Sequence, residues 1–263
     1  MRIIFIRHAE PDYSIDGLTS KGKKEAVLLS HRTKNWDVDA FFCSPLGRAK
    51  ETAAPTLRLH HAKATVYDWL QEFNYTAKDP ITGEERNPWD YMPDFYTTAP
   101  LMLSPKKWYQ SSIYRENPEI EKKWVEVTLG LDYILSKYGY KRHDGYYIFH
   151  EPNGTELNAE ISDIQLHGDK AYESRDEDDS KTIVIFAHLG VIDVMLAHLL
   201  NVSPVTLWHG TFLPPSSVTI VNAEKRLHNQ AHFRIQTLGD TSHLLMENEI
   251  VSSYGAFGSV FSF

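Results

Sequence analysis

The chain contains a single cysteine, Cys43, and no apolar run long enough to cross a lipid bilayer. One cysteine excludes a framework of internal disulfides and is typical of a reducing compartment, so we expect a cytoplasmic protein in which Cys43 is a buried structural thiol. The lack of a long apolar run predicts no membrane contact. Met1 is followed almost at once by a predicted strand, which leaves no room for a signal peptide.

Positive charge is also scarce. The 27 Lys and Arg residues are outnumbered by 35 Asp and Glu residues, which gives a net charge of -8. This balance argues against nonspecific binding to nucleic acid. It does not argue against a phosphorylated substrate, because a few convergent arginines make a local positive pocket in an acidic protein.

Apolar runs that stop abruptly at polar residues predict three buried strands, each followed by a helical pattern. Arg7 and His8 follow the first run, Ser44 follows the second, and His188 follows the third. Strands that alternate with helices predict an α/β fold, a three-layer α/β/α sandwich with a mainly parallel central sheet. Ligands usually bind at the carboxyl ends of such strands, so these residues are expected to form one site. The strands span about residues 2–6, 40–43 and 182–187.

Residues typical of helix caps indicate where two of the helices begin. Ser44 suits the N-cap and Pro45 the first position of the helix after the second strand, and Asn117 and Pro118 open a long amphipathic helix in the same way. The alternation near residues 217–237 predicts an antiparallel pair of strands. The expected helices span about residues 20–36, 46–59, 117–135 and 191–200.

The middle of the chain does not show this alternation of strands and helices, because prolines and aromatic residues dominate from residue 74 to about 115. A structureless loop of this length in a compact domain is usually functional. We therefore expect one domain, residues 1–263, with a core from about 1–73 and 181–263 and a large cap insertion at about 74–180.

Three motifs at the predicted strand ends resemble the signature of the histidine phosphatase superfamily, in its phosphoglycerate mutase-like branch. They are RHAEP at residues 7–11, SPLGRAKETA at residues 44–53, and HLG at residues 188–190. Residues 16–22 are similar to the loop that leads into the family's first helix. The resemblance covers the two terminal parts of the chain and says nothing of the middle.

Some positions depart from the family's pattern. Ala9 stands where many members have glycine, and Leu189 replaces a small residue. The asparagine that often binds phosphate soon after the first motif is missing, because Tyr13, Ser14 and Asp16 occupy that stretch, and we assign them no such role. The acid phosphatase branch carries an additional Arg after the first His and an Asp after the second. Neither is present, which favours the branch of mutases and small phosphatases.

The resemblance implies phosphoryl transfer through a covalent phosphohistidine. His8 would be the nucleophile, because a neutral imidazole nitrogen can attack phosphorus. Arg7 and Arg48 would bind the phosphoryl oxygens through forked hydrogen bonds, and His188, if protonated, would supply another donor in the transition state. The implied activity is that of a metal-independent phosphomonoester phosphatase, which uses no cofactor and has no metal ligand.

Residues 64–67 are a candidate for a further short strand, which would be the third along the chain. In the superfamily a carboxyl group beyond the third strand serves as proton donor, and Glu72 fits that place. Its apolar neighbours would raise its pKa toward neutrality, as general acid catalysis requires. Asp68 and Glu84 are the alternatives. Water would then attack the phosphohistidine, with Glu72 acting as base. His209 lies in a loop from which it could also reach the site.

The aromatic insertion is the natural lid over the phosphate pocket, so the substrate is expected to be a phosphorylated small molecule with an apolar or aromatic group. The aromatic residues could equally pack the cap onto the core, or bury a homodimer contact. Basic residues in the insertion leave open the recognition of a second anionic group. They are Lys78, Arg86, Lys106, Lys107 and Arg115.

Two alternatives to a phosphatase stay open. A phosphoglycerate mutase-type phosphotransferase would use the same phosphohistidine, but it must grip a small carboxylated substrate, and the irregular aromatic segment suits that poorly. A noncatalytic phospho-ligand binding domain would have lost its nucleophile or its acid, whereas His8 and Glu72 are both present.

Overall fold

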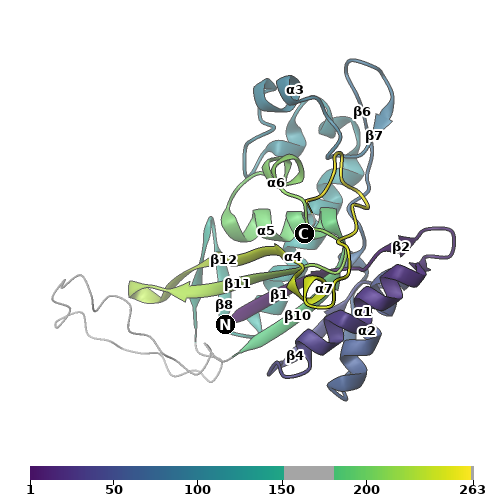
Figure 1. Ribbon diagram of the computed structural model, residues 1–263. Coiled ribbons are helices and arrows are strands. Elements are labelled where there is room, and N and C mark those ends of the chain that lie inside the picture. The colour runs from purple at the N-terminus through teal and green to yellow at the C-terminus, as the bar shows by residue number, and fades with distance from the viewer. Residues whose placement is uncertain (151–180, 262–263) are drawn as a thin grey trace.

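The computed structural model describes residues 1–150 and 181–261 (Figure 1). The predicted loop at Asn153-Gly154 and the acidic stretch at residues 175–179, expected as a solvated loop, lie outside the described residues.

An eight-stranded sheet forms the centre of the molecule, in the order β5-β4-β10-β1-β11-β12-β9-β8. The first four strands in this order run parallel, and the remaining neighbours pair antiparallel. The parallel strands are β5 (Ala64–Val66), β4 (Ala40–Cys43), β10 (Thr182–Ala187) and β1 (Arg2–Arg7). The antiparallel strands are β11 (Val218–Lys225), β12 (Gln230–Asp240), β9 (Tyr146–Phe149) and β8 (Tyr140–His143). The expected α/β class is confirmed, and all the strand ends singled out in the sequence belong to the parallel half.

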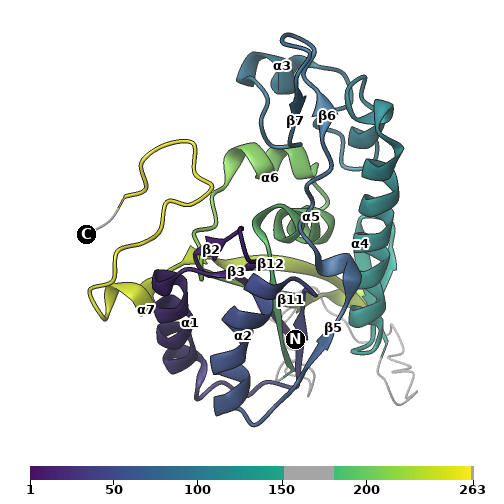
Figure 2. The same cartoon turned by 90° about the vertical axis from the view of Figure 1, so that its right-hand side faces the viewer.

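Helices cover both faces of the sheet, which explains why β1 is apolar at each of its four positions from Ile3 to Ile6 (Figure 2). Successive side chains of a strand point to opposite faces. Ile4 and Ile6 therefore pack in one cluster with Leu29 and Ala49, whereas Ile3 and Phe5 pack on the other side with Val191 and its neighbours. The first face carries α1 (Ser20–Thr33), α2 (Gly47–Leu59) and α7 (Ser242–Leu245), and the second carries α4 (Pro118–Ser136), α5 (Leu189–Leu200) and α6 (Pro204–Gly210).

The N-cap predicted from the sequence is confirmed for α4 but not for α2. The side chain of Asn117 accepts a hydrogen bond from the amide of Glu119, with Pro118 at the first helical position, as predicted. The predicted cap of α2 at Ser44 is wrong, because the helix begins at Gly47. The hydroxyl of Ser44 contacts His188 instead, at 2.7 Å.

Residues 74–116 form an irregular segment that stands above α5 and α6 (Figures 1 and 2). Its elements are β6 (Ala77–Lys78), β7 (Glu85–Arg86), α3 (Pro93–Thr98), η2 (Trp108–Gln110) and η3 (Tyr114–Glu116). The remaining short elements are β2 (Pro11–Asp12), β3 (Gly17–Leu18), η1 (Asp68–Leu70) and η6 (Leu227–Asn229).

The range expected as a cap insertion, 74–180, also contains parts of the core. The β8–β9 hairpin extends the central sheet, because Tyr147 and Ile148 pair with the start of β12. Helix α4 packs on α5 and buries Leu131 and Ile134 in the larger core cluster. Among the described residues of this range, the part that stands over the strand ends is therefore 74–116. None of the described helices is long and apolar enough to cross a membrane.

A buried histidine predicts acid sensitivity of the fold. His243 is 4 % exposed and shares a hydrogen bond with Ser216 Oγ. Burial, together with the charge of Arg32, lowers its pKa to about 4, below the value of about 6.5 in an unfolded chain. The unfolded state therefore takes up this proton first, and stability is lost as the pH falls from about 6.5 to about 4, by up to about 3 kcal/mol.

We expect His243→Gln to show a smaller loss of unfolding free energy than wild type over this pH range in urea titrations. The exposed His228 supplies the matched control, His228→Gln, which should titrate like wild type. Equal pH slopes for wild type and His243→Gln would contradict the assignment.

Candidate active site

His8 and His188 lie side by side because they follow neighbouring parallel strands in register. Arg7 of β1 pairs with Ala187 of β10, so the next residue of each strand emerges at the same edge of the sheet. The amide of His8 donates to the carbonyl of Ala187 at 2.9 Å, and the two imidazole centroids are 5.0 Å apart. Both side chains are buried. The structure thus brings together the two histidines selected from the sequence.

The tautomer of His8 is fixed by its own loop. Nδ1 lies 2.8 Å from the carbonyl oxygen of Ala9, and because a carbonyl only accepts, Nδ1 carries the proton. Nε2 therefore keeps its lone pair. Burial, and then the positive charges of Arg7 and Arg48, hold the pKa of His8 well below its usual value. His8 is consequently a neutral imidazole with a free lone pair on Nε2.

His188 is held from the side by Ser44. Nε2 shares a hydrogen bond with Ser44 Oγ, and Nδ1 is buried with no partner among the described residues. Burial lowers the pKa of His188 well below its usual value, and the nearby His8, Arg48 and Arg7 act in the same direction. The protonated His188 expected from the sequence is therefore disfavoured before substrate binds. A neutral imidazole can still donate one hydrogen bond.

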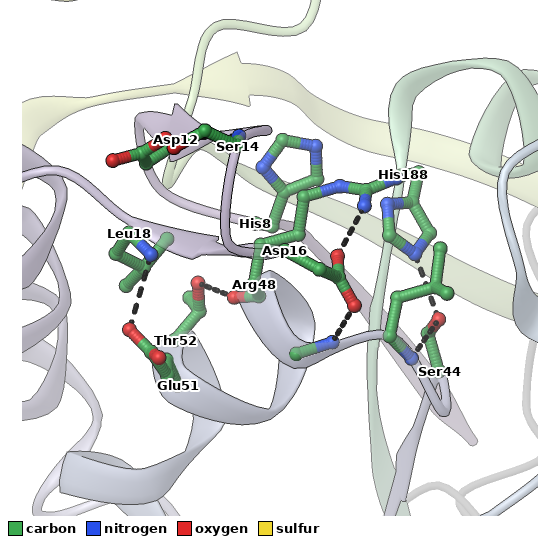
Figure 3. A network of polar contacts seen from close by, with 12 residues as sticks. His8, Asp12, Ser14, Asp16, Leu18, Ser44, Arg48, Glu51, Thr52 and His188 are labelled. Carbon is green, nitrogen blue, oxygen red and sulfur yellow. Dashed lines mark hydrogen bonds and ion pairs between the residues drawn. The ribbon is translucent and has the colours of Figure 1, made fainter.

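Arg48 is positioned by Asp16, a residue to which the sequence assigned no role (Figure 3). One oxygen of Asp16 accepts from Arg48 Nη1 and the other from the amide of Gly47, both at 2.6 Å. The ring of Tyr13 lies against the guanidinium, 5.0 Å from its carbon. One carboxylate therefore satisfies the first amide of α2 and orients the arginine that α2 carries.

Arg7 is buried and forms hydrogen bonds with residues distant in the sequence. Nη1 donates to the carbonyl of Leu213 at 2.5 Å, and Nη2 donates to the carbonyl of Tyr254 at 3.0 Å. Its guanidinium lies over the ring of Phe212. The sequence did not predict this use of the C-terminal segment, because residues 250–261 show no periodic pattern.

Glu72 lies against the first turn of α5, directly after His188. Its Oε1 accepts from the amides of Phe73 and Val191, at 2.7 and 3.1 Å. Burial raises the pKa of the carboxyl above its usual range, although these amides and the charge of Arg7 oppose the rise. The alternative acids lie elsewhere: Glu84 pairs with Arg86 in the irregular segment, and Asp68 lies in η1.

Beside this site lies a cavity of about 720 Å³. Leu189, next to His188, and Phe212, under Arg7, are among its lining residues. His209 also lines it, stacked on Tyr96 with ring centroids 4.0 Å apart. His209 thus reaches the cavity wall rather than a position among the site residues.

Asp193 is a second functional candidate that the sequence missed. It lies in α5, lines the cavity and is 1 % exposed. Oδ1 accepts from the hydroxyl of Thr211 at 3.2 Å, and Oδ2 is buried with no partner among the described residues. One sequence signal could have revealed it: Asp193 is the only acidic residue in the apolar helix pattern from Val191 to Leu200.

Gly190 allows Glu72 to approach α5. A Cβ at this position would lie 2.7 Å from Glu72 Oε1 and 2.5 Å from Trp89 Cζ3. We expect Gly190→Ala to displace the carboxyl and to lower turnover of a phosphomonoester about tenfold or more, since small misplacements of a reacting group are costly. Steady-state kinetics with a melting curve would test this. Unchanged turnover in a stably folded variant would show that the position of Glu72 is not critical.

Comparisons with known proteins agree with this arrangement. Residues 3–97 match the sequence profile of the histidine phosphatase superfamily (branch 1). A probable phosphatase of Schizosaccharomyces pombe is 34 % identical over 85 residues, which cover 28 % of this chain and 41 % of the relative. The chain thus aligns with about two fifths of that curated relative.

Solved structures show the same fold over most of the chain. A phosphoserine phosphatase variant of Entamoeba histolytica, in complex with phosphoserine, has a TM-score of 0.53 at 18 % identity and covers 92 % of this chain and 98 % of its own. A mycobacterial glucosyl-3-phosphoglycerate phosphatase has a TM-score of 0.52 at 15 % identity and covers 90 % and 98 %. These structures share the fold of this chain, and residues 3–97, which carry the first two motifs, resemble the histidine phosphatase superfamily.

Proposed function

We propose that the protein is a metal-independent phosphomonoester phosphatase that acts through a phosphohistidine on His8. The observation that carries this proposal is the state of His8, a neutral imidazole whose Nδ1 proton is held by the Ala9 carbonyl. The free lone pair of Nε2 is therefore available to attack phosphorus.

Three buried nitrogens around His8 support a phosphoryl-binding site. Arg7 Nε, Arg48 Nε and His188 Nδ1 have no hydrogen-bond partner among the described residues. The charges of both arginines act on both imidazoles, which places the four groups close together. Buried donors without partners are uncommon in folded proteins, and a phosphoryl group supplies the acceptor oxygens that would satisfy them.

Glu72 would supply the proton to the leaving group. As the bond between His8 Nε2 and phosphorus forms, the ester P–O bond breaks, and the Glu72 carboxyl protonates the departing oxygen. Its raised pKa keeps the carboxyl protonated to a higher pH than usual. In the second step the Glu72 carboxylate takes a proton from water, the water oxygen bonds to phosphorus, and the N–P bond breaks to release phosphate and free His8.

The experiment that tests the function is phosphate release from an aryl phosphate and a panel of phosphorylated metabolites, at mildly acidic and neutral pH with a chelator present. We expect turnover in the presence of chelator. Transfer of the phosphoryl group between metabolites without release would indicate a mutase-type phosphotransferase. Tight binding of phosphorylated ligands without turnover would indicate a binding domain.

The proposed substrate is a phosphorylated small molecule with an apolar or aromatic group, because aromatic side chains line the cavity beside the histidines. We place the protein in the cytoplasm. Burial raises the pKa of the Cys43 thiol to about 12, as expected of an unreactive structural cysteine. The proposed homodimer and the expected absence of nucleic-acid binding stay predictions.

A further inference from the structure

The cavity beside the phosphoryl site has an unusual chemical composition. Aromatic rings form much of its wall, and the described lining residues include two aspartates but no lysine or arginine. His209 adds no positive charge near neutral pH, because burial lowers its pKa. The aromatic residues of the wall include Trp89, Tyr96, Trp208, Phe212, Phe257 and Phe261.

The two aspartates differ in their surroundings. Asp90 is partly exposed and forms an ion pair with Arg86 at 3.4 Å. Asp193 is buried at the cavity wall, and its Oδ2 has no partner among the described residues. Arg7 is near enough to influence Asp193, but its Nη1 and Nη2 donate to backbone carbonyls. Asp193 is thus the acidic group left to interact with a ligand.

We propose that this cavity binds a cationic group of the substrate, so that the enzyme hydrolyses phosphomonoesters of alcohols that carry an ammonium group. The inference rests on the proposed function, which supplies the phosphoryl site at His8. Aromatic faces attract cations through their quadrupole, and a carboxylate adds direct charge pairing. The guanidinium of Arg7 over the Phe212 ring already shows one such contact at the edge of the cavity.

The spacing along α5 suits a compact substrate. His188 is the N-cap of α5 and Asp193 lies five residues further on, a rise of about 7.5 Å along the helix axis. A phosphoryl group at the histidines and an ammonium group at Asp193 would therefore be joined by a short linker. Burial raises the pKa of Asp193 well above its usual range, and a bound cation would favour the ionised carboxylate.

A substrate with a carboxylate in place of the ammonium group fits this cavity poorly. The carboxylate would face Asp193 with no lysine or arginine among the described lining residues to pair with it. A carboxylate beside ionised Asp193 is unfavourable in a partly desolvated site, and unlike an ammonium group it does not favour the ionised form of Asp193. The composition of the cavity therefore selects for positive charge at one end of the substrate.

The kinetic test compares phosphocholine with 3,3-dimethylbutyl phosphate, in which carbon replaces the charged nitrogen at nearly the same shape. For wild type with chelator present, we expect kcat/KM for phosphocholine to be higher by about tenfold or more. In Asp193→Asn this ratio should fall toward one. Glu25→Gln, which changes another buried carboxyl outside the cavity, should keep the wild-type ratio. A wild-type ratio near one would overturn the inference.

A binding test separates this inference from the proposed function. The fluorescence of the cavity tryptophans, Trp89 and Trp208, would report the binding of choline and of 3,3-dimethylbutanol to the His8→Ala protein. We expect the His8→Ala protein to bind choline more tightly than 3,3-dimethylbutanol, by about tenfold or more. This preference for choline should be smaller in the His8→Ala, Asp193→Asn double variant. Hydrolysis without a cation preference would overturn the inference alone. A cation preference in binding without hydrolysis by wild type would overturn the proposed function alone.

Discussion

Replacing His8 with alanine is expected to lower kcat/KM for phosphomonoesters by about 10⁴-fold or more, the scale seen when a covalent nucleophile is removed. His8 is the neutral imidazole whose Nε2 lone pair is free, and alanine offers no atom that can form the bond to phosphorus. Neither His188 nor Glu72 could replace it, since each is held by other contacts. The measurement is phosphate release from an aryl phosphate with chelator present.

Labelling quenched with alkali, in which phosphohistidine is stable, would add a direct readout of the intermediate. Wild type mixed with a phosphorus-labelled substrate should carry an acid-labile label on His8, and His8→Ala should carry none. The matched control is His31→Ala, because His31 is exposed on α1 far from the strand ends. Full activity in His8→Ala would refute the phosphohistidine mechanism.

Replacing Glu72 with glutamine is expected to lower turnover of an alkyl phosphate by about 10²- to 10³-fold, since proton donation to the leaving group is lost. An aryl phosphate should suffer much less, because a phenolate departs without full protonation. Glutamine keeps an oxygen that can accept from the amides of Phe73 and Val191, so the local structure should survive.

The pH dependence supplies a second signature of Glu72. Its pKa is raised, so wild-type kcat/KM should fall as the pH rises through that value and the acid is lost. Glu72→Gln should lack this fall. Glu84→Gln, which changes a carboxyl of the irregular segment, should keep it. Equal losses on alkyl and aryl esters, with the pH limb intact, would assign the proton donor elsewhere.

The sequence alone predicted the strand ends and the helix cap that depend on residues close together in the chain. The apolar run Ile3–Ile6 ends at Arg7 and His8, and the run ending at Ala187 is followed by His188. Parallel pairing then brings the two histidines together without further information. The Asn117 cap was readable for the same reason, because a cap depends on contacts within a few residues.

Contacts between distant segments could not be predicted in this way. Asp16 pairs with Arg48 only because the loop after β1 folds back onto the start of α2. That same contact explains the wrong cap, since Asp16 takes the role assigned to Ser44. Asp193 resembles a surface position in the sequence, and only packing shows that it is buried.

The hairpin of β8 and β9 shows a different limit. The Asp144-Gly145 dipeptide that forms its turn is a local sequence pattern, but nothing near it in the sequence identifies the strand that β9 pairs with. β9 joins β12 through residues more than eighty positions later in the chain. The boundary between cap and core therefore depended on a pairing that no short window of sequence contains.

The hydrogen bond from Arg7 to Tyr254 has a consequence for biosynthesis. The two residues are 247 positions apart, and β1 also depends on β10 and β11 for its neighbours in the sheet. At translation rates of about 5–20 residues per second, Tyr254 is synthesised about 10–50 s after Arg7. The apolar strand that carries it is unpaired for most of that time and is exposed to aggregation. The nascent chain is thus expected to need a chaperone, and to complete the contacts of Arg7 only after Tyr254 has been made.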